Sequence, residues 1–322
     1  MAFVSARGLT KIYRSKTTEV RALDGLDLNV AQGSVHGLLG PNGAGKTTTV
    51  KVFTTLIRPT AGEASVAGVD VLADPARVRR HIGSSGQYAA VDEQLTAREN
   101  LLLVGRLYHL GTRRARERAD ELLHVFDLMD AADRPLRTFS GGMRRRVDLA
   151  GALVIDPPVL FLDEPTTGLD PQSRLGLWDV IRERAAGGTT ILLTTQYLEE
   201  ADRLSDQISV IDHGKVIAEG TADQLKATVG GQRVELTVVE ESDIAAAAQQ
   251  LSRVGQGEAN IFGRTVSIQV ADATGALRAV LDGVSEAGIE LHEAGIRRPT
   301  LDDVFLALTG ERTDAEVSGE NL

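Results

Sequence analysis

The stretch Gly40-Pro41-Asn42-Gly43-Ala44-Gly45-Lys46-Thr47 decides the fold of this chain. It matches the phosphate-binding loop, in which a short variable segment separates a first glycine from a Gly-Lys-Thr end. Residues 34–39 before it predict a buried strand, and residues 47–57 after it predict a helix. That order of strand, loop and helix is the context the motif needs. A plain glycine-rich turn is the alternative, but it does not explain why every fixed position is filled.

The residues of this loop have the chemistry to hold phosphates. Glycine lets the backbone approach an anion closely, where a Cβ would clash. Successive backbone N–H groups and the N-terminus of the following helix then point toward the phosphates. Lys46 is long enough to reach the β- and γ-phosphates of a nucleotide, and the Thr47 hydroxyl can bind Mg²⁺.

Composition limits the classes of protein that fit. The chain has 322 residues, 42% apolar and 25% charged, as expected of a soluble globular protein with two domains. A net charge of −10 argues against a nucleic-acid partner held by phosphate contacts. Cysteine is absent, which excludes disulfides, thiolate metal sites and cysteine nucleophiles. No apolar run approaches the ~20 residues that cross a bilayer and no signal core is present, so we expect any membrane role to go through a partner.

Hydrophobic patterns predict the main elements of the first domain. Residues 2–35 are rich in strands, and residues 96–129 are helical, with Thr96 and Glu99 as a capping box at the start. Residues 189–195 form a continuous apolar and β-branched run, typical of a strand buried on both faces of a parallel sheet.

A change of pattern at Gly230-Gly231 predicts a second domain. Beyond it, alternating and helical segments predict a β-α-β-α-β-α unit. The last residues are polar and acidic and cannot bury a core. We therefore expect a nucleotide-binding domain at 1–229, a small α+β accessory domain at 230–310 and a disordered acidic tail at 311–322.

A second cluster of chemically active residues lies at the end of another predicted strand. The apolar run at 158–162 is followed by Asp163 and Glu164. A strand that delivers Asp163 beside the phosphate loop supplies a Mg²⁺ ligand, directly or through water. Glu164 can then orient and deprotonate an attacking water. The alternative, that the two carboxylates are only the polar end of a strand, is weaker because the phosphate loop is present.

Ser140-Gly141-Gly142 predicts a second anion-receptive helix N-terminus. Serine is a good N-cap, and the two glycines leave the helix start open. By itself this is equally a simple helix cap. Together with the phosphate loop it suggests a nucleotide held between two copies of the chain.

These motifs, in this order and spacing, resemble the ATP-binding subunits of ABC transporters over residues 2–225. Within that family the chain is similar to the daunorubicin/doxorubicin-resistance ATPases of drug exporters. The closer resemblance is carried by Ser140-Gly141-Gly142-Met143-Arg144-Arg145-Arg146, Thr194-Thr195-Gln196-Tyr197-Leu198-Glu199-Glu200-Ala201-Asp202 and Leu301-Asp302-Asp303-Val304-Phe305-Leu306-Ala307-Leu308-Thr309-Gly310. It implies an α/β P-loop NTPase fold, with a RecA-like core, an antiparallel β subdomain, a helical signature subdomain and a small C-terminal α+β domain.

The resemblance also implies a role for each motif residue, with ATP and Mg²⁺ as cofactors. Tyr13 stacks on adenine, and the phosphates are held by Gly40, Pro41, Asn42, Gly43, Ala44, Gly45, Lys46, Thr47 and Thr48. Thr47, Gln87 and Asp163 bind Mg²⁺. Glu164 is the catalytic base, assisted by Lys46 and by Gln196 at the γ-phosphate sensor position. The nucleotide of the opposite protomer is bound by Ser140, Gly141 and Gly142, and Asp170 shapes the loop across that interface.

The implied partners are a second copy of the chain and a separate transmembrane permease, which docks near residues 88–110. The implied localisation is the cytoplasmic face of the cell membrane, where the chain is attached only through the permease. No nucleic-acid partner is implied. Two residues depart from the wider family. Met143 stands where most members have Gln, and Gln196 stands where most have His. A Gln amide can donate one hydrogen bond there but carries no charge.

The implied function is ATP-driven export of a hydrophobic drug, such as an anthracycline-type antibiotic, or of a lipid. The alternative is an ABC-type ATPase with no transporter partner. DNA-maintenance ATPases insert a long coiled coil, and no extended heptad run lies between Thr47 and Ser140. Translation-associated ATPases carry two cassettes, and one phosphate loop is present here. A regulator that binds ATP and hardly hydrolyses it is separated from a pump only by kinetics.

Overall fold

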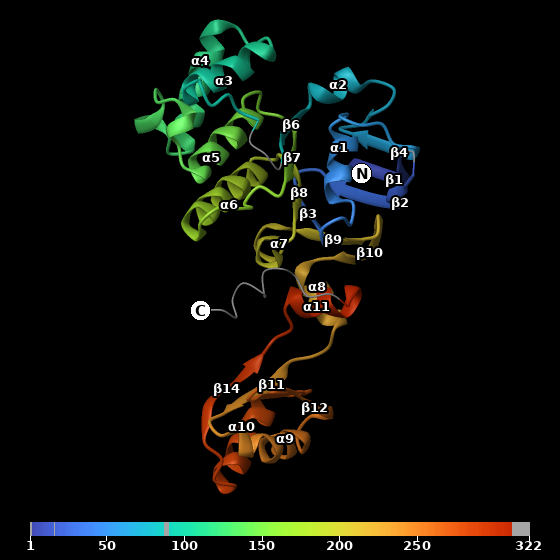
Figure 1. The fold of residues 1–322 in the computed structure, drawn as a ribbon, viewed down its shortest axis with the longest axis vertical. Coiled ribbons are helices and arrows are strands. Elements are labelled where there is room, and N and C mark those ends of the chain that lie inside the picture. Colours follow the sequence, from blue (N-terminus) through green and yellow to red (C-terminus); the bar gives the residue numbers. More distant parts are fainter. Residues whose placement is uncertain (1, 16, 87–89, 311–322) are drawn as a thin grey trace. The chain divides into compact units, whose positions relative to one another are not determined.

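The computed structural model describes residues 2–15, 17–86 and 90–310. The chain forms two compact units, the first ending at Ala222 and the second beginning at Asp223 (Figure 1). We expected a boundary at 229/230, whereas this division falls at the start of α8 (Ala222–Thr228). The predicted acidic tail, 311–322, lies outside the described residues.

A six-stranded, mostly parallel sheet forms the centre of the first unit. Three of its strands are buried at every residue, as the continuous apolar runs predict for a sheet covered on both faces. Neighbouring strands run parallel except at one edge, where the first two strands of the order given next form an antiparallel hairpin. In sheet order the strands are β10 (Lys215–Gly220), β9 (Gln207–Asp212), β3 (Val35–Leu39), β8 (Thr190–Thr195), β7 (Val159–Asp163) and β6 (Ile82–Ser85).

Alternate residues of the central strands enter two different cores. Leu160 and Leu162 of β7 pack into the core formed with the helices α3 to α6. Val159 and Phe161 pack into the other core, with α1 and a second sheet. Figure 1 shows these two layers on opposite sides of the central strands. The helices of the unit are α1 (Lys46–Phe53), α2 (Pro75–Arg79), α3 (Ala97–Leu107), α4 (Thr112–Val125), α5 (Gly141–Ala152), α6 (Pro171–Ala186) and α7 (Leu198–Leu204), with short 3₁₀ turns at Met129–Ala131 and Leu136–Thr138.

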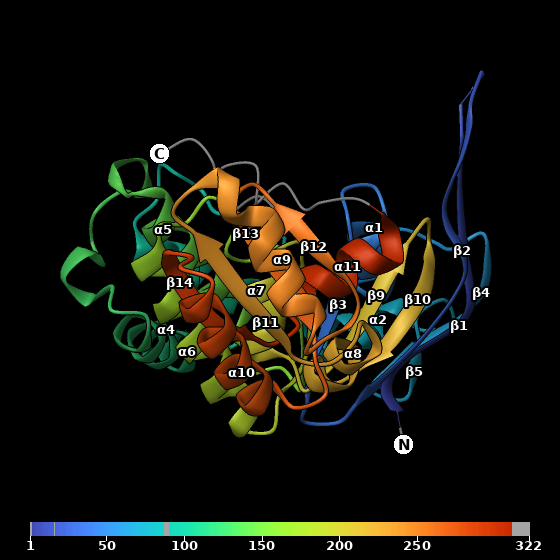
Figure 2. The ribbon, with the colours of Figure 1, turned by 90° about the horizontal axis from the view of Figure 1, so that it is seen from below.

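The second sheet of this unit is the antiparallel layer that the strand-rich N-terminal pattern predicts. Figure 2 shows its two long strands running side by side, in agreement with their pairing from Ala2 to Arg14. In sheet order the strands are β2 (Glu19–Ala31), β1 (Ala2–Arg14), β4 (Ala61–Val66) and β5 (Val69–Asp70).

The segment predicted as helical, 96–129, contains two helices. The first, α3, begins with the predicted capping box, in which Thr96 and Glu99 exchange side-chain to backbone hydrogen bonds. The helix ends before His109, whose φ of 58° is left-handed, and α4 begins after Gly111. A left-handed residue cannot continue a right-handed helix, which explains the break.

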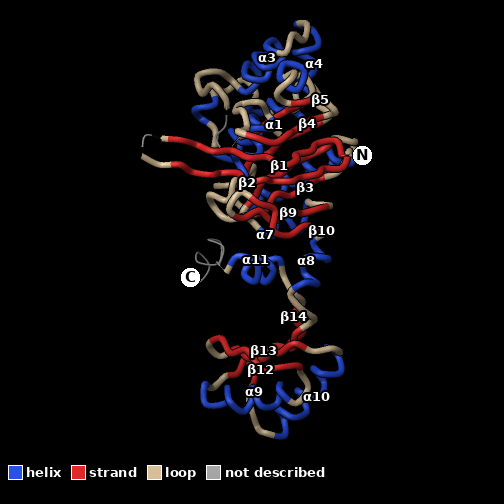
Figure 3. The backbone as a smooth tube through the Cα atoms, turned by 90° about the vertical axis from the view of Figure 1, so that its right-hand side faces the viewer, coloured by secondary structure: helices blue, strands red, loops and turns tan. Residues whose placement is uncertain are grey.

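The second unit contains one strand more than the sequence pattern indicates. From β11 to β14 its order is β-α-β-β-α-β, the split arrangement of ferredoxin-like domains. Its sheet order is β12-β13-β11-β14, with every pair antiparallel. We missed β12 because nearly all its residues are exposed, so this edge strand lacks an alternating pattern. Figure 3 shows α9 and α10 on one side of this sheet. The elements are β11 (Arg233–Val238), a 3₁₀ turn (Glu241–Asp243), α9 (Ile244–Ser252), β12 (Gln256–Phe262), β13 (Thr265–Gln269), α10 (Ala273–Glu286), β14 (Leu291–Arg297) and α11 (Leu301–Thr309).

Strand register brings the predicted motifs to one edge of the central sheet. Leu39, the last residue before the phosphate loop, pairs with Thr195, and Asp163 pairs with Thr194. Since these strands are parallel, their carboxyl ends meet at the same edge, where ligands of such sheets bind. Within the described part of the chain, no helix is both long enough and apolar enough to cross a bilayer.

A buried histidine beside the phosphate loop predicts a pH-dependent stability. His36 on β3 is 1% exposed, and its Nε2 lies 2.8 Å from Ser209 Oγ on β9. Burial lowers the pKa of His36 to about 4. The unfolded chain titrates near 6.5, so the stabilisation is complete above pH 6.5 and is lost as the pH falls from there toward 4, by about 3 kcal/mol in all.

Urea unfolding at several pH values tests this prediction. His36→Gln keeps an amide for Ser209 and cannot titrate, so its free energy of unfolding should fall less than that of the wild type between pH 7 and pH 4.5. Equal losses in the two proteins would show that His36 does not drive the pH dependence.

Candidate functional site

The phosphate loop connects β3 to α1, as predicted. Gly43 and Gly45 have φ angles of 84° and 112°, a left-handed conformation that favours glycine. A Cβ on Gly45 would lie only 2.6 Å from the Ala22 carbonyl oxygen, so a larger residue does not fit. Gly45 is also the N-cap of α1 and leaves the backbone N–H groups of the helix start open to an anion. The other predicted phosphate contacts lie in this loop and the first turn of α1: Gly40, Pro41, Asn42, Ala44, Lys46, Thr47 and Thr48.

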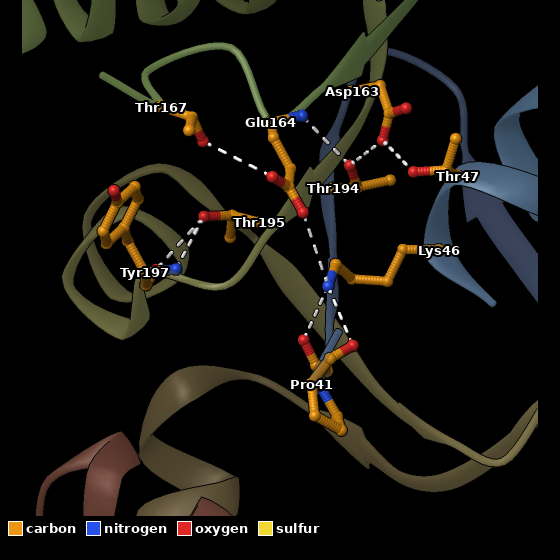
Figure 4. Close-up of polar contacts among 10 residues, drawn as sticks. Pro41, Lys46, Thr47, Asp163, Glu164, Thr167, Thr194, Thr195 and Tyr197 are labelled. Carbon is orange, nitrogen blue, oxygen red and sulfur yellow. Dashed lines mark hydrogen bonds and ion pairs between the residues drawn. The ribbon is translucent and has the colours of Figure 1, made fainter. Parts of the chain in front are cut away.

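Lys46 is buried at the centre of the site (Figure 4). Its ammonium group donates to the carbonyl oxygens of Gly40, at 2.7 Å, and Pro41, at 3.1 Å. It also lies 3.5 Å from Glu164 Oε1. Burial lowers the pKa of Lys46, while the carboxylates of Glu164 and Asp163 oppose that change. A cation held between loop carbonyls and a carboxylate is well placed to meet phosphate oxygens.

Asp163 and Thr47 provide the oxygen atoms that Mg²⁺ prefers. Thr47 Oγ1 donates to Asp163 Oδ1 at 3.2 Å, and Thr194 Oγ1 donates to the same oxygen at 2.5 Å. Mg²⁺ bound with a nucleotide takes one or two protein oxygens and completes its shell with phosphates and water, so these residues fit the ion. The described residues contain no cluster of three His, Cys, Asp or Glu side chains suited to a metal. Gln87, the third predicted ligand, lies outside the described residues.

Glu164 has an unusual backbone conformation. Its φ is 50°, in the left-handed region that residues with a Cβ rarely adopt. Its N–H donates to both the carbonyl oxygen and the Oγ1 of Thr194, each at 3.1 Å. Its Oε2 accepts from Thr167 Oγ1 at 3.4 Å (Figure 4). The carboxylate is therefore directed toward Lys46 and the phosphate loop, where it can accept a proton from water.

The Ser140-Gly141-Gly142 turn meets Asp170 rather than the phosphate loop. Ser140 caps α5, accepting from the Met143 N–H at 3.2 Å. Gly142 is packed against Ser173, whose Oγ would lie 2.8 Å from a Cβ added to Gly142. Asp170 caps α6 and accepts from Ser173 N at 2.9 Å and from Ser173 Oγ at 2.6 Å, and these bonds lower the pKa of Asp170. We did not predict Ser173, although the pattern Asp-Pro-x-Ser at a helix start indicates a capping contact.

The fold separates the two predicted anion sites of one chain. α5 packs into the core on one face of the central sheet, and α1 packs into the core on the other. The Ser140-Gly141-Gly142 turn therefore begins a helix on the opposite side of the sheet from the phosphate loop (Figure 1). The structure brings together Lys46, Thr47, Asp163 and Glu164, and leaves the turn outside that group.

Two further predicted residues lie at strand ends. Tyr13 is near the end of β1 and is 42% exposed, with the Lys11 ammonium 5.1 Å from its ring centre. Gln196 directly follows β8 and is half-buried. Because Thr195 pairs with Leu39, Gln196 starts from the edge that carries the phosphate loop.

The sequence did not predict the contacts of two buried polar residues near the site, Thr194 and Glu200. Thr194 looked like one member of an apolar strand, yet its hydroxyl joins Asp163 to the Glu164 backbone. Glu200 on α7 is completely buried, and it accepts from Thr166 Oγ1 at 2.8 Å and from Trp178 Nε1 at 2.9 Å. Burial raises the pKa of Glu200, and those two hydrogen bonds oppose the rise. A glutamate in a short amphipathic helix carries no sequence sign of burial, because such residues are almost always exposed.

Comparison with known proteins agrees with this geometry. The family described as "ABC transporter" matches residues 23–167, and the family described as "ATP-binding protein DrrA1-3-like, C-terminal domain" matches residues 220–309. Among curated proteins, the daunorubicin resistance ATP-binding protein DrrA2 of Streptomyces coeruleorubidus is 54% identical over 97% of this chain and 96% of its own length. The daunorubicin/doxorubicin resistance ATP-binding protein DrrA of Streptomyces peucetius is 49% identical over 97% of this chain and 93% of its own length.

Solved structures carry the same fold. The ATP-binding cassette MJ0796, in a dimeric post-hydrolysis state with ADP and Pi, superposes with a TM-score of 0.63 at 27% identity. The match covers 68% of this chain and 98% of that one. These findings confirm the predicted P-loop NTPase fold and the predicted resemblance. The chain belongs to the ABC transporter family, as an ATP-binding and ATP-hydrolysing subunit.

Proposed function

We propose that this ATPase powers export of a hydrophobic drug, of the anthracycline type, through a separate transmembrane permease. The relatives at 54% and 49% identity are named for daunorubicin resistance, which favours a drug over a lipid as the cargo. The observation that carries the mechanism is the position of the Ser140-Gly141-Gly142 turn, on the other side of the sheet from the phosphate loop.

A homodimer completes the site. A nucleotide on the phosphate loop of one chain needs a second anion-receptive helix N-terminus, and only another copy of the chain can offer its turn to that nucleotide. Ser140, Gly141 and Gly142 of one copy would then contact the nucleotide of the other, with Asp170 beside them. The dimeric state of the similar cassette MJ0796 supports this arrangement.

The residues of the site would divide the chemistry as follows. Lys46 and the loop amides bind the phosphates, and Tyr13 stacks on the base. Thr47 and Asp163, with Gln87, would hold Mg²⁺, which neutralises charge on the phosphate oxygens when it is bound. Glu164 accepts the proton of the attacking water, and Gln196 donates a hydrogen bond to the γ-phosphate.

The proposed contact with the permease lies on the helical layer. The predicted docking segment, 88–110, includes α3 and its C-cap Tyr108. The side chains of Leu103, Leu107 and Tyr108 are 43%, 69% and 41% exposed. Apolar side chains gathered on one exposed helix favour a protein partner. The chain would then lie at the cytoplasmic face of the cell membrane, attached through the permease. The residues from 230 to 310 would form an accessory domain that tunes assembly.

Replacement of the proposed base, Glu164, tests both the proposed mechanism of ATP hydrolysis and the proposed drug export. Glu164→Gln keeps the shape of the side chain and removes its basicity, so ATP should still bind while turnover falls by at least about 10²-fold. Daunorubicin efflux from cells that express the chain with its permease should stop. Glu199→Gln, at an exposed residue that pairs with Arg203 on α7, is the matched control and should leave both unchanged.

Normal hydrolysis by Glu164→Gln would show that another group is the base. Normal hydrolysis by the wild type without any efflux, and without stimulation by a membrane protein from a neighbouring reading frame, would support an ATPase that has no transporter partner.

The role of Gln196 gives a second prediction. If its amide donates to the γ-phosphate in the closed dimer, Gln196→Ala should cost roughly 1.5–3 kcal/mol, the value of a bond to a charged group. This corresponds to a loss of roughly ten- to a hundredfold in single-turnover hydrolysis by the assembled transporter. Gln196→His should be tolerated, because imidazole can also donate there. A wild-type rate and ATP affinity in Gln196→Ala would leave Gln196 no part in the chemistry.

A further inference from the structure

One buried arginine of α5 holds the backbone around Glu164. Arg145 is 6% exposed, and its guanidinium group points at backbone carbonyl oxygens rather than at solvent. Nε donates to Pro165 O at 2.7 Å, and Nη2 donates to Asp163 O at 3.2 Å and to Glu164 O at 3.1 Å. Nη1 donates to the carbonyl oxygen of Gly86. A single side chain thus joins α5, the end of β7 and the residue after β6.

A carboxylate one turn further along α5 completes the arrangement. Asp148 Oδ2 lies 3.4 Å from Arg145 Nη1, so the buried cation has a buried counter-ion. Asp148 also accepts from Ser85 Oγ at 2.6 Å and from the Ala90 N–H at 2.7 Å. The pair therefore fixes Arg145 in place and attaches α5 to residues on the β6 side of the sheet.

Arg145 binds the backbone of Glu164 at the residue whose φ of 50° makes that backbone strained. A left-handed φ places the Cβ of a non-glycine residue too close to the neighbouring carbonyl, and such strain persists only where surrounding contacts enforce it. At Glu164 the enforcing contacts come from both sides: Thr194 binds its N–H, and Arg145 binds its carbonyl oxygen. The flanking carbonyls of Asp163 and Pro165 are bound by the same guanidinium group.

We propose that Arg145 is a positioning residue for hydrolysis, which holds the Glu164 backbone in its left-handed conformation and ties it to α5. The proposal rests on the proposed role of Glu164 as the base. α5 begins at Gly141, directly after its N-cap Ser140. If the nucleotide bound to the partner copy displaces α5, the Arg145 side chain would therefore move the backbone of Glu164 with it.

The geometry requires a guanidinium group. Arginine presents five N–H donors in a rigid planar fork, and here donors from three different nitrogens are used. Lysine keeps the positive charge opposite Asp148 but offers one nitrogen, which cannot span the carbonyls of Gly86 and Pro165 together. If Arg145 serves only to neutralise Asp148, lysine should replace it.

Arg145→Lys in the full-length chain separates positioning from charge compensation. We expect kcat for ATP hydrolysis to fall between roughly ten- and a hundredfold, because a small misplacement of a catalytic group costs that much. The Kd for ATP should stay within about twofold, because the loss of an interaction that acts only in the transition state lowers kcat without weakening substrate binding. The matched control is Arg118→Lys on α4, where a largely buried guanidinium group donates to Leu153 O at 2.9 Å and pairs with Glu121 and Asp156 instead of with the backbone around Glu164. Its kcat should equal that of the wild type.

Rates are compared at a temperature where circular dichroism shows every protein folded, and Glu164→Gln is measured alongside. A wild-type kcat for Arg145→Lys while Glu164→Gln is inactive overturns the proposal and leaves the base intact. An active Glu164→Gln would instead remove the base on which the proposal rests. As a second measurement, guanidinium ion added to Arg145→Ala should raise kcat where methylammonium does not. Equal effects of the two cations would also contradict positioning.

Discussion

One carboxylate oxygen, Asp163 Oδ1, is where the parts of the proposed ATP site meet. It accepts the hydroxyl of Thr47, from the helix after the phosphate loop, and the hydroxyl of Thr194, from the neighbouring strand. Both donors depend on strand register, because Asp163 pairs with Thr194 and Leu39 pairs with Thr195. A slip of one residue in either pairing would turn these side chains to the other face of the sheet and separate them. The packing of β3, β7 and β8 is therefore a condition of the chemistry.

The two cores explain why a single chain keeps its two predicted anion sites apart. Alternation along β7 sends Leu160 and Leu162 to the helical layer and Val159 and Phe161 to the layer with α1. The phosphate loop belongs to one layer and the Ser140-Gly141-Gly142 turn to the other. A sheet that is buried on both faces keeps the layers that cover it apart, and this separation is the reason why the proposed mechanism needs a second copy of the chain.

Buried charge surrounds the strand end that carries Asp163 and Glu164. Lys46, Arg145, Asp148 and Glu200 are each less than a tenth exposed, and each has hydrogen-bond partners. Charges in a protein interior are costly unless they are paired and hydrogen-bonded. Here the cations bind backbone carbonyl oxygens at the end of β7 and in the loops that follow β3 and β6. These charges hold irregular backbone, including the left-handed Glu164, where regular secondary structure cannot.

The sequence alone determined the fold class, the phosphate loop and the strand that ends in Asp163 and Glu164. Glycine spacing and continuous apolar runs are local signals, and each follows from the conformation or burial of its own residues. The exposed edge strand Gln256–Phe262 gave no such signal, because it has neither a buried face nor a hydrophobic alternation.

Only the tertiary structure decided which side chains lie against these motifs. Thr194, Ser173 and Arg145 come from elements distant in sequence, and their partners are set by register and by helix packing. The burial of Glu200 is likewise decided by α6 packing over α7, since Trp178 supplies its hydrogen bond. A residue type states what a side chain can bind, whereas its neighbours follow from contacts that span the whole chain, and those contacts exist only once the two cores have formed.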